Sequence, residues 1–229
     1  MPQNPTPVKT ARRTERRAER RAEMVQAAMD AVRRHGAGVS VADIAGAAGI
    51  TKPVLYRHFT DRADLHRAVG EQAATLLLAR IAPELDRDHE PVEHIRAIIE
   101  AFLAGIEDEP ELWRFVVHHP AERTSGAEIV DDVRQQIARP LATLLGERLR
   151  SRGLDSGGAE AWAQGLVGMA QSAGDWWLER RTMSRTALTD YLTTFIWGGL
   201  SGVLAGAKIP VPAALRLVPD PDPKGNRHA

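Results

Sequence analysis

The sequence predicts an all-α protein with about nine helices. Apolar residues recur at spacings of three and four from residue 14 to residue 206, which is the period of an amphipathic helix. No segment alternates apolar and polar residues as a half-buried strand would, and Ser, Thr, Asp, Pro and Gly stand where helices should begin or end. The 229 residues suffice for an N-terminal three-helix domain and a larger helical body.

Composition excludes several classes of protein. There is no Cys, so disulfides, thiolate nucleophiles and Cys-based zinc sites are ruled out. No window of 18 apolar residues and no apolar segment after the polar start are found, so we expect no membrane contact and a cytoplasmic protein. A Gly-rich phosphate loop, GxSxG and HExxH are all missing, and we therefore expect neither an enzyme nor a cofactor.

Charge is unevenly distributed, although the net charge is zero. Residues 1–67 hold 13 Lys/Arg against 7 Asp/Glu, and residues 68–229 hold 17 against 23. A basic N-terminal end on a mildly acidic body is typical of nucleic-acid binding. We predict four segments: a disordered basic arm (1–13), a DNA-binding domain (14–67), a body (68–206) and a tail with five prolines (207–229).

The first predicted helix runs from about Thr14 to His35 and ends at Gly36. Its apolar stripe is expected to support the next two helices. The helix start carries a basic run interrupted by two glutamates, and this run has two open interpretations: a solvated helix start or a set of contacts to DNA phosphates or a minor groove. Its arginines are Arg12, Arg13, Arg16, Arg17, Arg20 and Arg21.

Two short helices separated by a tight turn are predicted within residues 40–67. Ser40 can cap the first, which starts at Val41, and Asp43 completes a capping-box pattern. Gly49 suits a left-handed turn. Thr51 can cap the second helix, and Pro53 falls in its first turn.

The second short helix has little apolar surface and many outward cationic and aromatic groups. Leu55 and Phe59 face inward, four residues apart. This pattern fits a helix-turn-helix whose second helix enters a DNA major groove. The outward residues are Lys52, Pro53, Val54, Tyr56, Arg57 and His58.

The stretch GVSVADIAGAAGITKPVLYRHFTDRADLHRAV closely resembles the DNA-binding domain of the TetR family of bacterial transcriptional regulators, over about residues 15–67. The resemblance implies that Tyr56 and His58 contact phosphates; plain packing and a partly buried structural histidine are the alternatives. It assigns base-edge or groove-floor contacts to Lys52, Pro53, Val54 and Arg57. The predicted set is completed by Ser40, Val41, Thr51 and Arg62.

Six further helices are expected after the helix-turn-helix. The first is capped by Asp61, with Asp64 at the box position, and should stop near Ile81, before Pro83. The others span about residues 91–107, 109–118, 125–152, 158–181 and 184–206. The helix over about residues 125–152 begins at a capping box, Ser125 to Glu128, and Pro140 should kink or break it.

Seven glycines inside the last two helices each cost roughly 1 kcal/mol of helix propensity relative to Ala: Gly165, Gly168, Gly174, Gly198, Gly199, Gly202 and Gly206. Either another backbone approaches closely or one subunit packs tightly. The TetR resemblance implies a four-helix homodimer interface, which would set two recognition helices about 34 Å apart on a palindromic operator in double-stranded DNA. The predicted interface residues are Trp162, Gly165, Gly168, Trp197, Gly198 and Gly202.

Large side chains in the body can form ordinary core or leave an apolar cavity between helices. The resemblance implies such a cavity, a small apolar effector, and a switch that separates the recognition helices by tilting the fourth helix. The predicted pocket residues are Phe102, Trp113, Val117, Met169, Gln171, Asp175, Trp176 and Phe195. We expect no metal site, because the adjacent His118 and His119 point about 100° apart on a helix and chelate poorly.

The stretches GLVGM (Gly165 to Met169) and FIWGGL (Phe195 to Leu200) resemble an actinobacterial subgroup of fatty-acid-synthesis regulators that sense long acyl-CoA. The subgroup makes fatty acyl-CoA one candidate effector, beside other lipid or drug-like apolar molecules. We predict a ligand-responsive, dimeric transcriptional regulator, most plausibly a repressor. The alternatives are a lipid-dependent activator or co-repressor-type regulator and a non-specific architectural DNA binder.

Overall fold

The computed structural model describes residues 7–87, 90–117 and 125–205; for residues 7–13, 86 and 125–133 it describes the backbone alone. Within these ranges the chain forms nine helices and no strand, which confirms the predicted fold class. The helices are α1 (Pro7–His35), α2 (Val41–Ala47), α3 (Lys52–Leu55), α4 (Arg62–Asp86), α5 (Pro91–Asp108), α6 (Pro110–Val117), α7 (Ser125–Arg150), α8 (Ala159–Arg180) and α9 (Arg185–Leu204).

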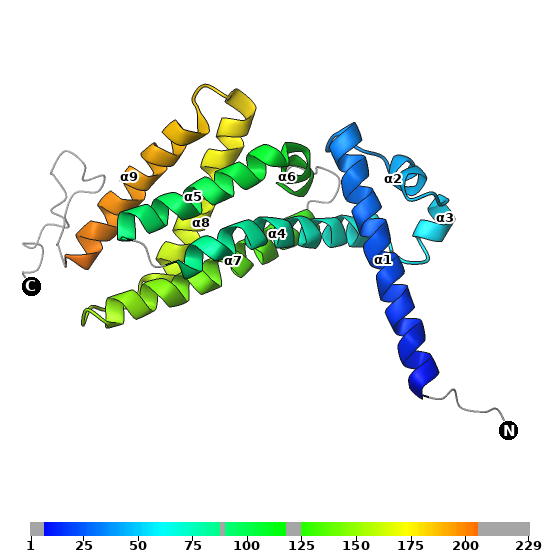
Figure 1. The fold of residues 1–229 in the computed structure, drawn as a ribbon, viewed down its shortest axis with the longest axis horizontal. Helices are drawn as coiled ribbons and strands as arrows, with labels where there is room; N and C mark the ends of the chain where they lie inside the picture. Colours follow the sequence, from blue (N-terminus) through cyan, green and yellow to red (C-terminus); the bar gives the residue numbers. More distant parts are fainter. Residues whose placement is uncertain (1–6, 88–89, 118–124, 206–229) are drawn as a thin grey trace, which may run out of the picture.

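The molecule has two parts joined by α4. Helices α1 to α3 gather at one end, α5 and α7 to α9 form the body, and α4 runs from beside α3 into the body (Figure 1). Each part has its own apolar core. The N-terminal core is built around Met29, Leu55 and Phe59, and the body core around Leu103, Ile106 and Trp177, all at most 2% exposed.

Helix α1 begins earlier than predicted. Its backbone is helical from Pro7, so the expectation of a disordered arm over residues 1–13 is wrong for residues 7–13. Pro at a first helical position and the Arg and Ala residues that follow favour a helix. Its packed part is also shorter than the predicted stripe: Ala18 and Ala22 are exposed, and burial begins at Met24.

Two prolines lie inside helices rather than ending them. α4 continues through Pro83 to Asp86, so the predicted stop before Pro83 is wrong. α7 continues through Pro140 to Arg150, which rules out a break there and leaves a kink as the other predicted effect of this proline. A proline removes only one backbone hydrogen bond, and packing of the flanking turns can outweigh that loss. The predicted cap at Ser125 depends on side chains that lie outside the described part of the structure. The predicted tail from residue 207 also lies outside it.

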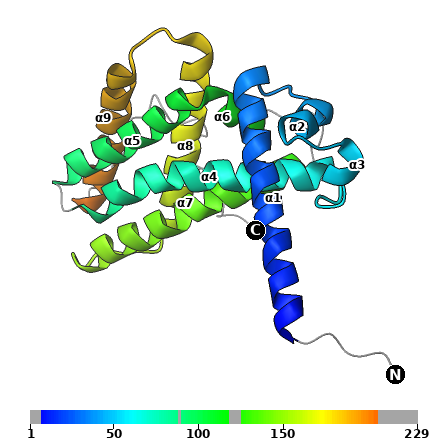
Figure 2. The ribbon, with the colours of Figure 1, turned by 45° about the vertical axis from the view of Figure 1, so that its right-hand side comes forward.

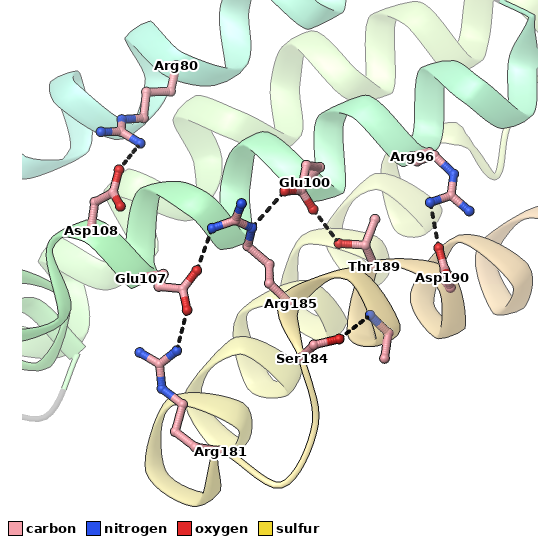
Figure 3. A network of polar contacts seen from close by, with 11 residues as sticks. Arg80, Arg96, Glu100, Glu107, Asp108, Arg181, Ser184, Arg185, Thr189 and Asp190 are labelled. Carbon is pink, nitrogen blue, oxygen red and sulfur yellow. Dashed lines mark hydrogen bonds and ion pairs between the residues drawn. The ribbon is translucent and has the colours of Figure 1, made fainter.

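A seam of ion pairs fastens α9 to α5 (Figure 3). The Arg185 guanidinium donates to Glu100 at 2.6 Å and also pairs with Glu107, which accepts from Arg181 at 2.6 Å. Hydrogen bonding to the two glutamates raises the pKa of Arg185. Thr189 donates its hydroxyl to Glu100 at 2.8 Å. The seam runs alongside the apolar contact in which Leu188, Leu192 and Ile196 of α9 are buried in the body core.

Candidate nucleic-acid interface and ligand cavity

The turn between α2 and α3 is fixed by local interactions. Ser40 Oγ accepts from the Asp43 N–H at 3.2 Å, and the Asp43 carboxylate accepts from the Ser40 N–H at 3.3 Å, which is the predicted capping box. A hydrogen bond from the Ser40 hydroxyl is the main cause of a lowered Asp43 pKa. Gly49 has φ +66°, as predicted for the turn. Thr51 stands at the N-cap of α3, but its side chain makes no capping hydrogen bond.

Helix α3 is four residues long and is extended by a hydrogen-bonded turn through Phe59. Leu55 and Phe59 anchor it, with 0% and 1% of their surfaces exposed. Five of the predicted DNA-contacting residues are exposed on or just before this segment: Thr51, Lys52, Pro53, Tyr56 and Arg57. Val54 and His58 are half-buried. The α3 segment therefore offers a cationic surface on a rigid apolar base.

The remaining predicted DNA contacts flank this segment. Ser40 is exposed at the start of α2, and Val41 is half-buried beside it. Arg62 is exposed in the first turn of α4. That helix is capped as predicted, since Asp61 accepts from the Asp64 N–H at 2.7 Å.

Helix α1 holds the α3 segment in place through Arg21. The Arg21 guanidinium donates to the His58 carbonyl at 2.7 Å and to the Asp64 carboxylate at 2.7 Å, and it lies 4.2 Å from the centre of the Phe59 ring. Its hydrogen bonds lower the pKa of Asp64. The sequence pattern placed Arg21 in an undivided basic run and did not reveal this structural role.

Helix α6 joins the body to the N-terminal core. Its Leu112, Phe115 and Val116 are buried in the core that α1 to α3 form. His66 of α4, 3% exposed, donates from Nε2 to the Phe115 carbonyl at 2.8 Å, because the carbonyl can only accept. The sequence pattern assigned α6 to the body and did not reveal this burial.

Polar contacts tie the same junction to the end of α1. Arg33 makes a two-fold contact with Glu109, at 2.9 Å from Nε and 2.8 Å from Nη2, and these bonds raise the Arg33 pKa. The Ala37 N–H donates to Glu111 at 3.0 Å. A movement of α6 would therefore displace α1 and α4 through these direct contacts.

A cavity of about 430 Å³ lies between α4, α5, α6, α7, α8 and α9. Its wall is mainly Leu, Ile, Val, Phe and Trp, with a few polar residues among them: Glu90, His94, Arg134, Arg148, Arg152 and Gln171. The lining residues of α7 extend from Arg134 to Leu149, which corresponds to a helix rise of roughly 22 Å. The cavity is thus long and predominantly apolar.

Four of the eight predicted pocket residues line this cavity: Phe102, Trp113, Val117 and Gln171. Asp175 does not line it, but its carboxylate accepts a hydrogen bond from Trp113 Nε1. Met169 packs against the body core instead. Trp176 and Phe195 are 38% and 72% exposed, so the structure places both on the surface.

The predicted dimer residues divide into two groups. Trp162 and Trp197 line the cavity. A Cβ added at Gly165, Gly168 or Gly198 would meet nothing within 4 Å, so close packing inside the subunit does not explain these glycines. Gly202 is half-buried. Gly174, which is not among the predicted dimer residues, is explained by packing inside the subunit, because a Cβ there would come within 2.7 Å of Ile106.

Among the described residues, no group of three or more His, Cys, Asp or Glu could hold a metal ion; His118 and His119 lie outside them. Within the same ranges, none of the helices combines the length and the apolar character that a membrane crossing requires.

The fold and the exposed α3 segment define the class of the protein: a helix-turn-helix DNA-binding transcriptional regulator, not an enzyme. Two family models match the chain. The one described as "Bacterial regulatory proteins, tetR family" matches residues 25–69, and "Tetracyclin repressor-like, C-terminal domain" matches residues 80–211. The chain belongs to the TetR family, as its sequence motif indicated.

Relatives of known sequence are also regulators. The chain is 36% identical over 202 residues to the uncharacterized HTH-type transcriptional regulator Rv0472c of Mycobacterium tuberculosis, covering 87% of this chain and 84% of that protein. It is 29% identical over 170 residues to the HTH-type transcriptional activator FasR of Mycolicibacterium smegmatis, covering 74% and 76%.

Solved structures share the fold. The FadR regulator of Bacillus subtilis, solved in complex with stearoyl-CoA, is 14% identical and covers 78% of this chain and 98% of its own, with a TM-score of 0.64. A tetR-family regulator from Streptomyces coelicolor is 20% identical, covers 82% and 83%, and has a TM-score of 0.64.

Proposed function

We propose that the chain is a dimeric repressor that binds a palindromic operator and changes its DNA affinity when an elongated apolar effector enters the cavity. The observation that carries the proposal is the α3 segment, where Lys52, Tyr56 and Arg57 are exposed above the buried Leu55 and Phe59. Rigid placement of cationic and aromatic groups is what reading of a major groove requires.

Within this proposal the predicted DNA-contacting residues, exposed and half-buried, divide by chemistry. Lys52 and Arg57 donate to guanine O6 and N7, while Pro53 and Val54 contact a thymine methyl group. Tyr56 and His58 contact phosphates, together with Ser40, Val41, Thr51 and Arg62 around the groove edge. Arg17 and Arg21 reach the same segment from α1.

Dimerisation is supported by surface that one subunit leaves uncovered. Tyr191 and Phe195 of α9 are 66% and 72% exposed, and Gly165 and Gly198 have open space where a side chain would lie. An exposed Phe195 three residues before an open Gly198 on the same helix suits close helix packing between two subunits. A two-fold dimer would set two α3 segments about one DNA turn apart.

The effector is proposed to be a long apolar molecule, with a fatty acyl chain as the favoured type. The cavity is lined by apolar side chains along roughly 22 Å of α7. Arg134 lies toward one end and Arg148 toward the other, so an anionic head group could be bound at either. The stearoyl-CoA bound by the FadR regulator of similar fold is compatible with this class of ligand.

The coupling path is proposed to run through α6. Trp113 and Val117 line the cavity, whereas Phe115 on the same helix is buried in the N-terminal core. A ligand that prefers one position of α6 would therefore shift α1 and α4 through Arg33–Glu109 and His66–Phe115. Tilting of α4 would change the separation of the two α3 segments.

The test is a gel-shift titration of the full chain on the DNA upstream of its own gene, against random competitor, repeated with long-chain acyl-CoA and with free fatty acid. We expect competitor-resistant binding that the lipid weakens. Arg57→Ala should reduce the preference for the operator, costing about 1–3 kcal/mol if its contact is bidentate. Arg139→Ala, an exposed body residue, is the matched control. Equal binding to all duplexes, with no operator found by selection from random DNA, would instead indicate an architectural protein.

An activator or co-repressor-type regulator is the second candidate. The FasR relative is named an activator. Coupling through α6 is compatible with a ligand that weakens DNA binding and with one that strengthens it. The same titration separates the two, because lipid that strengthens operator binding would replace the repressor proposal.

A further inference from the structure

The N-terminal half of α1 projects beyond the core of the protein. Burial on α1 begins at Met24, and every side chain from residue 14 to residue 20 is exposed. Residues 7–20 add roughly 21 Å of helix, and within the described part of the chain nothing buries the side chains of residues 14–20. Figures 1 and 2 both show this end of α1 extending away from α2, α3 and the body.

This projecting helix is unfavourable on its own. Residues 7–21 hold seven Lys/Arg and only two Glu, and the first turn contains no acidic residue. Cations near a helix N-terminus oppose the helix dipole, and like charges four residues apart repel each other. An anionic partner along this surface would relieve both costs.

The cationic surface is continuous with the α3 segment. Arg16, Arg17 and Arg20 project from a sector of roughly 100° of the helix, and Glu15 and Glu19 lie on the neighbouring sector. Arg17 Nη2 donates to the Arg57 carbonyl at 3.4 Å, so one edge of the sector reaches the proposed base-reading residues. Arg20 pairs with Glu23 at 2.7 Å, but both are exposed and such pairs are weak.

We infer that residues 7–20 of α1 form a helical arm that binds the sugar-phosphate backbone of double-stranded DNA beside each operator half-site. Arg16, Arg17 and Arg20 are the phosphate-contacting residues. The arm lengthens the footprint of each subunit, by at most about six phosphate spacings of one strand. The arm adds DNA affinity without base preference. This inference rests on the proposed function only for the position of α3 on DNA.

Arg21 marks the inner limit of the arm. Its guanidinium is committed to the His58 carbonyl and to Asp64, and it stacks on Phe59. Arg21 therefore acts within the protein, whereas the side chains of Arg16, Arg17 and Arg20 are exposed. This division makes the arm testable without disturbing the fold.

The experiment measures binding of full-length protein to a labelled random-sequence duplex and to the operator duplex across about 50 to 200 mM salt. The variant is Arg16→Gln/Arg20→Gln. The control, Arg139→Gln/Arg180→Gln, removes the same charge from exposed body positions. We expect the arm variant to lower the slope of log affinity against log salt by about two and to weaken both duplexes by roughly tenfold at low salt. The ratio of operator to random affinity should not change.

An unchanged slope in the arm variant, or an equal fall in the control, would overturn the arm. A fall confined to the operator would also overturn it, because that result would mean base reading. If the wild-type protein prefers no duplex, operator recognition fails, yet the slope on random DNA still reports whether the arm contacts phosphates.

Discussion

The N-terminal core and the α8–α9 side of the body differ in how completely one subunit covers its own apolar surface. In the N-terminal core, Leu55 and Phe59 are at most 1% exposed. On α9, Tyr191 and Phe195 are 66% and 72% exposed, and the adjoining body contains a partly open cavity of about 430 Å³. The first region is completed within one subunit, with α6 side chains among its members, and the second leaves apolar surface open.

This difference indicates where the protein can be changed by other molecules. A closed core holds the α3 segment in one position, which suits the reading of a fixed DNA geometry. An incompletely covered body can gain stability from a second subunit or a ligand. Helix α6 belongs to both regions, because Phe115 is buried in the closed N-terminal core and Trp113 lines the cavity of the body.

The largest expected effect is in the closed core. Phe59→Ala should lower the free energy of unfolding by about 3–5 kcal/mol, since it removes a buried ring and leaves a cavity. It also removes the surface on which Arg21 stacks. Urea unfolding followed by circular dichroism measures the change, and the loss should not depend on protein concentration. A cost below about 1 kcal/mol would mean that this core is not closed.

The next effect tests the open region. Phe195→Glu should weaken the dimer by at least about 2 kcal/mol, because it places a charge in a desolvated contact. Analytical ultracentrifugation over a range of protein concentrations measures the shift of the equilibrium toward monomer. Thr186→Glu, at an exposed position in the first turn of the same helix, is the control and should leave the dimer intact. Equal behaviour of the two variants would move the interface away from Phe195.

A third variant separates the cavity from the rest of the body. Ala170 is half-buried and lines the cavity, so Ala170→Phe should occupy ligand space while leaving DNA binding in place. The effect of lipid on DNA affinity, expected at about 1–3 kcal/mol, should then disappear. Gel shifts with and without long-chain acyl-CoA measure this. Ala82→Phe, on the exposed side of α4, should respond to lipid like the wild type; an unchanged response in Ala170→Phe would place the ligand elsewhere.

The smallest effect concerns the Arg21–Asp64 contact. Hydrogen bonds from Arg21 lower the pKa of Asp64 in the folded protein, so the contact stabilises at neutral pH and is lost as pH falls below the usual value near 3.8. Asp64→Asn should cost about 1 kcal/mol at pH 7, given partial exposure. Urea unfolding of both proteins over a pH series should show the difference vanishing in acid. A difference that stayed constant with pH would contradict an ionic origin.

Local signals predicted the N-terminal domain well. The Ser40–Asp43 capping box and the left-handed turn at Gly49 depend on neighbouring residues, and both are confirmed. Continuation of α4 through Pro83 was not predictable in this way, because it depends on packing by distant helices. Nor could spacing separate Phe102, which lines the cavity, from the surface residue Phe195. Both lie on helical stripes, and only tertiary arrangement distinguishes a wall from an exterior.

The burial of α6 in the N-terminal core bears on how this protein could be recombined with its relatives. The two family matches meet between residues 69 and 80, which suggests a junction for chimeras within α4. A fragment cut there would lack Leu112, Phe115 and Val116, the side chains that close its core from the body side. A transplant of the DNA-reading module must therefore carry α6 with it or replace those three side chains, so the unit of exchange is discontinuous in sequence.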